Sequence, residues 1–160
     1  MSNVYPLFQL GMDLESVSST AHEEAAGLAG APEALRRKDY FIERNGVCCA
    51  GTHLIIDLWE AERLDDLPHI EETLKACVVA AGATLLHIHL HHFTPNMGVS
   101  GVAVLAESHI SIHTWPERGY AALDVFMCGA ARPHEAVAVL RKAFRPLRLE
   151  VSEHLRGQTS

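Results

Sequence analysis

The chain has 160 residues, of which 48% are hydrophobic and 21% are charged, and its formal net charge is −7. This composition predicts one globular domain with a core large enough to fold alone. The negative charge argues against nucleic acid or an anionic membrane as a partner, and no apolar run predicts a membrane-spanning helix. The N-terminus lacks a signal-peptide pattern, and Cys48, Cys49, Cys77 and Cys128 lack zinc-like spacing, so we expect free thiols in the cytoplasm.

The first 45 residues differ in character from the rest of the chain. Residues 1–45 mix small, glycine, proline and acidic residues with weak periodicity. We interpret them as a partly ordered N-terminal extension, with helix expected only near His22–Leu28. Residues 46–160 carry regular patterns and are predicted to form the domain itself.

The first half of that domain predicts a strand, a helix and a second strand. The β-branched run Gly51–Trp59 is typical of a buried strand. Apolar residues at helical spacing predict a helix over Leu67–Ala81, which Gly82 ends. The run Ala83–Phe93 predicts the next strand.

Further strands and a second helix follow. Strands are predicted over Gly101–Ser108, Ser111–Trp115 and Tyr120–Cys128, with a turn at Pro116–Gly119. Pro133 opens a helix through Phe144, and Leu147–Val151 is expected as an edge strand. This order predicts an α+β fold, a two-layer sandwich of a mainly antiparallel sheet with two helices packed on one face.

The segment HIHLHH raises the question of a metal site. Alternate side chains of a strand share a face, so His87, His89 and His91 are expected to point the same way. Three imidazoles on one face suit zinc or iron. No carboxylate ligand accompanies them, so we predict no metal and keep a histidine-ligated metal protein as an alternative from another class.

Ser108, His113, Asp124 and Cys128 do not decide the function when each is taken alone. A Ser-His-Asp hydrolase would need a nucleophile elbow, and Ser108 has no Gly-x-Ser-x-Gly context. Cys128 is equally consistent with a small buried side chain.

The full run GVSGVAVLAESHISIHTWPERGYAALDVFMCG, Gly98–Gly129, is more specific. It resembles the signature of the prokaryotic S-adenosylmethionine decarboxylase family, a group of self-processing pyruvoyl enzymes. The resemblance extends from about Gly51 to Phe144 and leaves the N-terminal extension outside it. It implies decarboxylation of S-adenosylmethionine for spermidine synthesis by a cytoplasmic enzyme.

The resemblance implies roles for five residues in processing and catalysis. The chain would cut itself between Glu107 and Ser108, after the Ser108 hydroxyl attacks the preceding carbonyl. His113 corresponds to the processing base and Ser100 to a hydroxyl that assists it. Ser108 would become the pyruvoyl cofactor, which forms a Schiff base with the substrate amine. Cys128 corresponds to the proton donor of the decarboxylation.

The resemblance also implies substrate contacts and a partner. Glu117 corresponds to an acid that binds the ribose hydroxyls, and Phe93 is the candidate for stacking on adenine. His53 and Asp57 are expected to line the site from a partner subunit, because the resemblance implies a homodimer with shared sites. The nearest rival reading is a pyruvoyl-dependent decarboxylase of arginine or ornithine, and another is a silent binding partner of a true decarboxylase.

Overall fold

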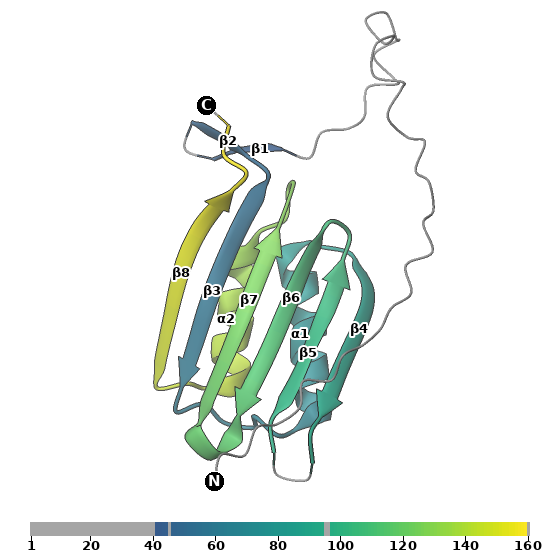
Figure 1. The fold of residues 1–160 in the computed structure, drawn as a ribbon, viewed down its shortest axis with the longest axis vertical. Coiled ribbons are helices and arrows are strands. Elements are labelled where there is room, and N and C mark those ends of the chain that lie inside the picture. The colour runs from purple at the N-terminus through teal and green to yellow at the C-terminus, as the bar shows by residue number, and fades with distance from the viewer. Residues whose placement is uncertain (1–40, 45, 95–96, 160) are drawn as a thin grey trace, which may run out of the picture. The chain divides into compact units, whose positions relative to one another are not determined.

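The computed structural model describes residues 41–44, 46–94 and 97–159, and its centre is one sheet backed by two helices (Figure 1). The sheet order is β4-β5-β6-β7-β3-β8, and each neighbouring pair is antiparallel. The strands are β3 (Gly51–Trp59), β4 (Leu85–His92), β5 (Val99–Leu105), β6 (Ser108–Trp115), β7 (Tyr120–Met127) and β8 (Arg148–Arg156). The predicted α+β sandwich is confirmed.

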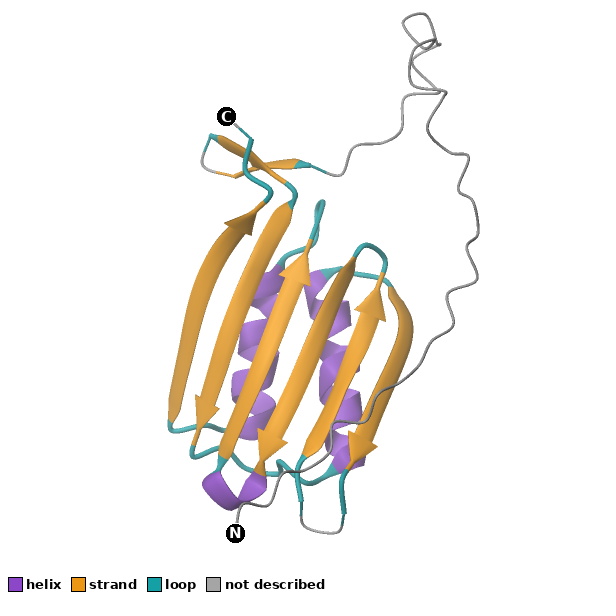
Figure 2. Cartoon of the chain, in the orientation of Figure 1, coloured by secondary structure: helices purple, strands orange, loops and turns teal. Residues whose placement is uncertain are grey.

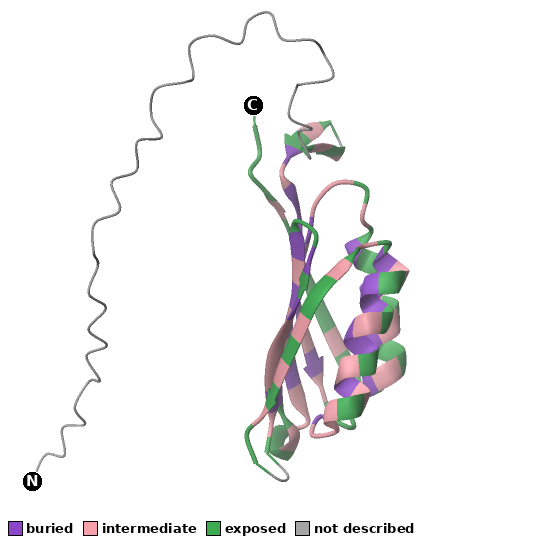
Figure 3. Ribbon diagram, turned by 90° about the vertical axis from the view of Figure 1, so that its right-hand side faces the viewer, coloured by how far each residue is buried: buried purple, intermediate pink, exposed green. Residues whose placement is uncertain are grey.

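The helices α1 (Leu67–Ala81) and α2 (Pro133–Phe144) have the bounds that the sequence predicts. The Asp66 carboxylate accepts the His69 backbone N–H at the start of α1, and Gly82 ends it with a positive φ of 70°. Both helices cover the same face of the sheet, as the side view shows (Figure 3). No helix of the described residues is long and apolar enough to cross a membrane.

The core lies between this sheet face and the helices. Leu54 and Ile56 of β3 and Leu123 of β7 are buried there against Leu74 of α1 and Phe144 of α2. Each such side chain contributes about 1.5–3 kcal/mol on full burial. Because the core lies on this side, the fold does not depend on the opposite face to bury its apolar residues.

We call the opposite side of the sheet the open face, because no helix among the described residues covers it (Figure 2). Its side chains follow from the strand alternation and the register. They are His53, Ile55, Asp57 and Trp59 of β3, His87, His89 and His91 of β4, Ser100, Val102 and Val104 of β5, His109, Ser111, His113 and Trp115 of β6, Tyr120, Ala122, Asp124 and Phe126 of β7, and Arg148, Glu150, Ser152, His154 and Arg156 of β8.

The strand bounds differ from the prediction in one place that matters for function. Ser108 was expected at the end of a strand, but it begins β6 after a two-residue turn formed by Ala106 and Glu107. The register pairs Leu105 with Ser108 across this turn. The predicted scissile bond therefore lies in a hairpin turn. The edge strand β8 is also longer than predicted.

A short hairpin precedes the main sheet and was not predicted. Strand β1 (Ile42–Arg44) pairs with β2 (Val47–Cys49), so regular structure begins a few residues before the expected boundary at residue 45. The expected helical stretch His22–Leu28 lies outside the described residues, as do residues 1–40 in general.

Candidate active site

A pocket of about 570 Å³ lies at the end of the sheet where β5 begins and β6 ends. Ser100 and His113 are directly paired across β5 and β6, and Ser100 Oγ is 2.9 Å from His113 Nδ1. Phe93 and Glu117, which the sequence also predicted as site residues, line the same pocket. Glu117 lies in the short helix η2 (Pro116–Arg118). The volume is in the usual range for small-molecule sites. The structure thus brings together four residues that the sequence predicted as functional.

A buried threonine holds this pocket in shape. Thr114 Oγ1 accepts the Val99 backbone N–H at 2.7 Å and donates to the Leu64 carbonyl at 2.6 Å. A Cβ added at Gly98 would lie 1.9 Å from the Thr114 carbonyl oxygen, so only glycine allows this close approach. These contacts fix the start of β5, and with it Ser100, against β6.

Trp115 also lines the pocket, and the sequence analysis did not assign it a role. It is 41% exposed and lies two residues after His113 on the same face of β6. That spacing was a usable signal, because a tryptophan two positions along a strand from a functional histidine shares its face. Exposed aromatic rings in a pocket of this size suit a flat, apolar part of a ligand.

Asp57 is connected to this pocket through aromatic rings. The Tyr120 hydroxyl donates to Asp57 Oδ1 at 2.5 Å, and this bond, with some burial, raises the pKa of Tyr120 to about 12. The Tyr120 ring lies 5.3 Å from the ring of Trp115 and 4.4 Å from that of Trp59. Asp57 therefore positions Tyr120 beneath the pocket wall and does not itself line the pocket.

A second cluster occupies the opposite end of β6. Glu107, Ser108 and Cys128 line a separate pocket of about 220 Å³ beside the β5–β6 turn. The Cys128 backbone N–H donates to Ser108 Oγ at 3.2 Å, and Ser108 is only 9% exposed. The Ala106 N–H donates to the Thr84 carbonyl and ties the turn to the loop after α1.

The environment of Cys128 favours the protonated thiol. Burial is the main cause of its raised pKa, and the negative charge of Glu107 and the neighbouring Cys49 thiol act in the same direction. A raised pKa keeps the proton on sulfur at neutral pH, which suits a group that donates it rather than a nucleophile.

Within one chain the two clusters do not meet. Ser108 and His113 are five residues apart on β6, so their side chains point to opposite faces. At about 3.3 Å per residue they are also roughly 17 Å apart along the strand. His113 therefore cannot act as a base on Ser108 of the same chain in this conformation.

Asp124 has partners other than those of the hydrolase hypothesis. Its carboxylate accepts from Ser111 at 3.1 Å and is 3.0 Å from His53 Nε2, and it contacts neither Ser108 nor His113. Arg156 Nη1 lies 3.1 Å from His53 Nδ1. Because a guanidinium only donates, Nδ1 accepts and Nε2–H donates to Asp124. His53 therefore bridges Arg156 and Asp124 on the open face, and Ser108, His113 and Asp124 do not form a serine protease-like triad in the described part of the chain.

Three further histidines lie on the open face of the edge strand β4. His87, His89 and His91 are exposed there, while Ile88 and Leu90 pack against the core, as the alternation predicted. Within residues 41–44, 46–94 and 97–159, no three His, Cys, Asp or Glu side chains are grouped as metal ligands.

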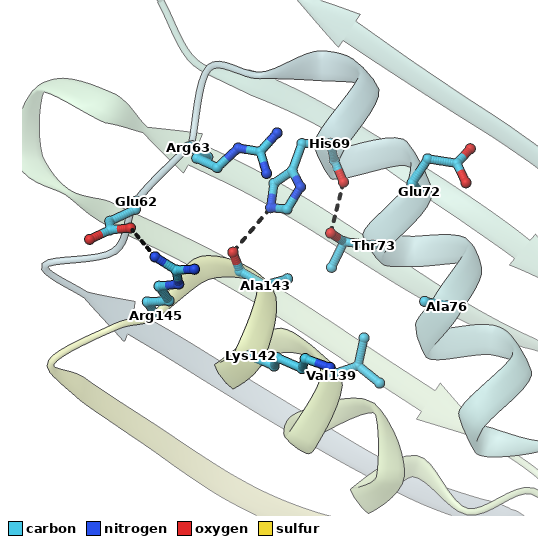
Figure 4. Close-up of a pocket in the computed structure, with 10 residues that line it drawn as sticks. All are labelled: Glu62, Arg63, His69, Glu72, Thr73, Ala76, Val139, Lys142, Ala143 and Arg145. Atoms are coloured by element: carbon cyan, nitrogen blue, oxygen red, sulfur yellow. Dashed lines mark hydrogen bonds and ion pairs between the residues drawn. The ribbon is translucent and has the colours of Figure 1, made fainter.

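Another, largely apolar pocket is on the helix side of the molecule. It is a groove of about 540 Å³ between α1 and α2, where His69 Nε2 bonds the Ala143 carbonyl at 3.1 Å and Glu62 pairs with Arg145 at 3.8 Å (Figure 4). The sheet separates it from the open face, and it contains none of the predicted site residues. We therefore assign the candidate active site to the two clusters on β5, β6 and β7.

Comparison with known proteins identifies the family of this chain. A model of the S-adenosylmethionine decarboxylase family matches residues 52–157. The chain belongs to this family. It is 49% identical over 108 residues to the S-adenosylmethionine decarboxylase proenzyme of Thermomicrobium roseum, and the alignment covers 67% of this chain and 93% of that protein. It is 51% identical over 110 residues to the corresponding proenzyme of Methanococcus maripaludis strain C7, with 67% and 89% covered.

A solved structure is similar over the same region. The crystal structure of the adenosylmethionine decarboxylase from Aquifex aeolicus superimposes with a TM-score of 0.64 and 34% sequence identity. The match covers 70% of this chain and 94% of that one. The likeness therefore extends to nearly the whole of the solved chain, and the predicted family resemblance is confirmed.

Proposed function

We propose that this chain decarboxylates S-adenosylmethionine with a pyruvoyl group that it makes from its own Ser108. The main observation that supports this proposal is one pocket lined by Phe93, Ser100, His113 and Glu117, in a chain of the S-adenosylmethionine decarboxylase family. The alternative, decarboxylation of arginine or ornithine, would leave the exposed aromatic rings of Phe93 and Trp115 without a purpose.

The residues around Ser108 fit self-cleavage. Ser108 directly follows Glu107 in the chain, and its hydroxyl oxygen accepts a hydrogen bond from the Cys128 backbone N–H. Attack by Ser108 Oγ on the Glu107 carbonyl carbon breaks the C–N bond, forms an ester and frees the amine. A base then removes the Ser108 α-proton. The bond between Ser108 Cβ and Oγ breaks, and Glu107 leaves with a new C-terminal α-carboxylate. Loss of ammonia and uptake of water complete the pyruvoyl end.

The paired side chains Ser100 and His113 suit the role of processing base. A bonded hydroxyl orients the imidazole, and an imidazole exchanges protons near neutral pH. The pyruvoyl ketone would supply the electron sink for the loss of CO₂ from the substrate. Cys128, held as a thiol, would return the proton to the substrate carbon. Phe93 and Trp115 would stack on adenine, and the Glu117 carboxylate would accept the ribose hydroxyls.

We further propose that the active unit is a homodimer formed through the open face. Ile55, Val104 and Trp115 are 41%, 40% and 41% exposed there. An uncovered sheet face of this kind is typical of an interface. Ser108 and His113 are far apart within one chain, so a site that used both would need a second copy or a rearrangement of β6. His53 and Asp57, on the same face, would then contribute to the shared site.

We place this enzyme in the cytoplasm and in spermidine biosynthesis, where decarboxylated S-adenosylmethionine serves as the aminopropyl donor. Support for the compartment comes from the four cysteines, all free in the structure. The proposed chemistry also needs Cys128 as a reduced thiol.

The substrate is tested by parallel assays of the purified, cleaved protein. Release of CO₂ from carboxyl-labelled S-adenosylmethionine, arginine and ornithine is measured at equal concentrations. We expect release from S-adenosylmethionine alone, and Phe93→Ala should raise KM for it because a stacking ring is lost. CO₂ from arginine or ornithine alone would overturn the substrate assignment and leave the pyruvoyl chemistry intact.

The shared site is tested by co-expressing two inactive variants, each with a different tag. The Ser108→Ala chain keeps His113, and the His113→Ala chain keeps Ser108. If sites are shared, the mixed dimer contains one complete site, and the His113→Ala chain should cleave when co-expressed but only slowly alone. Cleavage that stays slow in the mixture would mean that both residues act within one chain.

A further inference from the structure

The turn that carries the predicted scissile bond has an unfavourable backbone conformation. Four non-glycine residues in the described part of the chain have positive φ: Glu60, Arg63, Glu107 and Arg145. Glu107, at φ 59°, is the residue whose carbonyl would be attacked. A residue with a Cβ in this region meets steric conflict with its own carbonyl, and glycine or asparagine normally occupies it.

The turn type adds to this cost. Two-residue hairpin turns usually have positive φ at the first position or at both, because those turns match the twist of the strands. Here only the second residue, Glu107, is positive, while Ala106 is not. That pattern is typical of a type II turn, which favours glycine at the second position and splays the strands of a hairpin.

The surrounding contacts prevent the turn from relaxing. Leu105 and Ser108 are paired across it, and both are buried. The Ala106 N–H is bonded to the Thr84 carbonyl at 3.0 Å, and Ser108 Oγ receives the Cys128 N–H. The neighbouring strands thus hold both ends of the turn in place, and Glu107 must absorb the conformational cost.

We infer that the strained backbone of Glu107 drives the first step of self-cleavage, the transfer of its acyl group from the Ser108 nitrogen to the Ser108 oxygen. This inference rests on the proposed function. In the ester the link from the Glu107 carbonyl to Ser108 Cα runs through Oγ and Cβ in place of the nitrogen. The connection is one atom longer, so Glu107 can leave the left-handed region. The proton of Oγ passes to the nitrogen, and no oxidant or co-reactant is needed.

The identity of residue 107 should therefore affect cleavage through its backbone rather than its charge. Glu107→Gly removes the steric conflict from the uncleaved turn. Ester formation then no longer releases free energy by relieving that conflict. We expect cleavage to slow roughly fivefold to thirtyfold, which corresponds to the usual cost of a left-handed residue. Glu107→Ala keeps the Cβ and should cleave near the wild-type rate, and Glu107→Asn should be intermediate.

The rates are measured on full chains made by cell-free translation, by following the uncleaved chain into two fragments on a denaturing gel. Hydroxylamine, which attacks esters but not amides, reports the ester fraction, and this should fall in Glu107→Gly by a similar factor. Arg145→Gly is the matched control, because it relieves a positive φ at the end of α2, away from the turn. It should cleave at the wild-type rate.

The possible results separate this inference from the proposed function. Equal rates for Glu107→Gly and Glu107→Ala, with a wild type that cleaves, would overturn the role of strain and leave self-cleavage standing. If Glu107→Gly and Glu107→Ala both cleave equally slowly, the loss of the Glu107 side-chain carboxylate, and not the relief of strain, explains the slower cleavage. A wild type that never cleaves would remove both proposals. Slow Glu107→Gly beside normal Glu107→Ala would support the inference.

Discussion

Ser108→Ala is expected to abolish both self-cleavage and decarboxylation. The change removes the hydroxyl that must attack the Glu107 carbonyl, and alanine offers no other nucleophile at this position. Intact-mass measurement should give one chain of the full length. The wild type should give two chains, residues 1–107 and 108–160, with the second lacking a free amino terminus and their summed mass reflecting one water gained and one ammonia lost.

Ser111→Ala is the matched control for this result. Ser111 lies on the same strand, but its hydroxyl points to the open face and donates to Asp124. We expect it to cleave like the wild type. A Ser108→Ala chain that still divides after Glu107, or a wild type that stays intact after long incubation and shows no carbonyl reactivity, would contradict self-cleavage at this bond.

Cys128→Ala is expected to cleave but to turn over slowly. Cleavage requires Ser108 and a base, whereas turnover requires an acid at the substrate carbon. Loss of one positioned acid costs on the order of a hundredfold to ten-thousandfold in rate. Protonation at the wrong carbon leaves the substrate nitrogen on residue 108. Inactivation during turnover should therefore accompany the slow rate, with small chains that begin with alanine in the mass spectrum.

The thiol itself can be checked by its reactivity. Since burial and Glu107 raise the pKa of Cys128, its thiolate is scarce at neutral pH, and its alkylation by iodoacetamide should accelerate only above the pH at which an ordinary thiol ionises. Cys48→Ala is the control, because Cys48 is exposed and lies on the β1–β2 hairpin. It should retain full turnover. A Cys128→Ala enzyme with the wild-type rate and no alanine-terminated chain would reduce Cys128 to a packing residue.

The local elements of this fold could be predicted because their determinants are close together in the chain. The helix α1 has a capping Asp66, an apolar face at helical spacing and Gly82 at its end, and each acts within a few residues. Pro133 likewise opens α2. Strand alternation also correctly separated His87, His89 and His91 from Ile88 and Leu90. The resemblance identified the family, which the comparisons confirm, because its signature is continuous in the sequence.

The arrangement of the site depended on contacts between distant parts of the chain. The sequence put Ser108 at the end of one strand and His113 in the next, and so could not reveal that they share β6 and point to opposite faces. Nor could it pair Ser100 with His113, or join Asp124 to His53 and Ser111. The physical reason is that strand order and register arise from hydrogen bonds and packing across the sheet. The sequence by itself determined the helices, the strand faces and the reactive residue types, while the tertiary structure decided that these residues form two separate clusters.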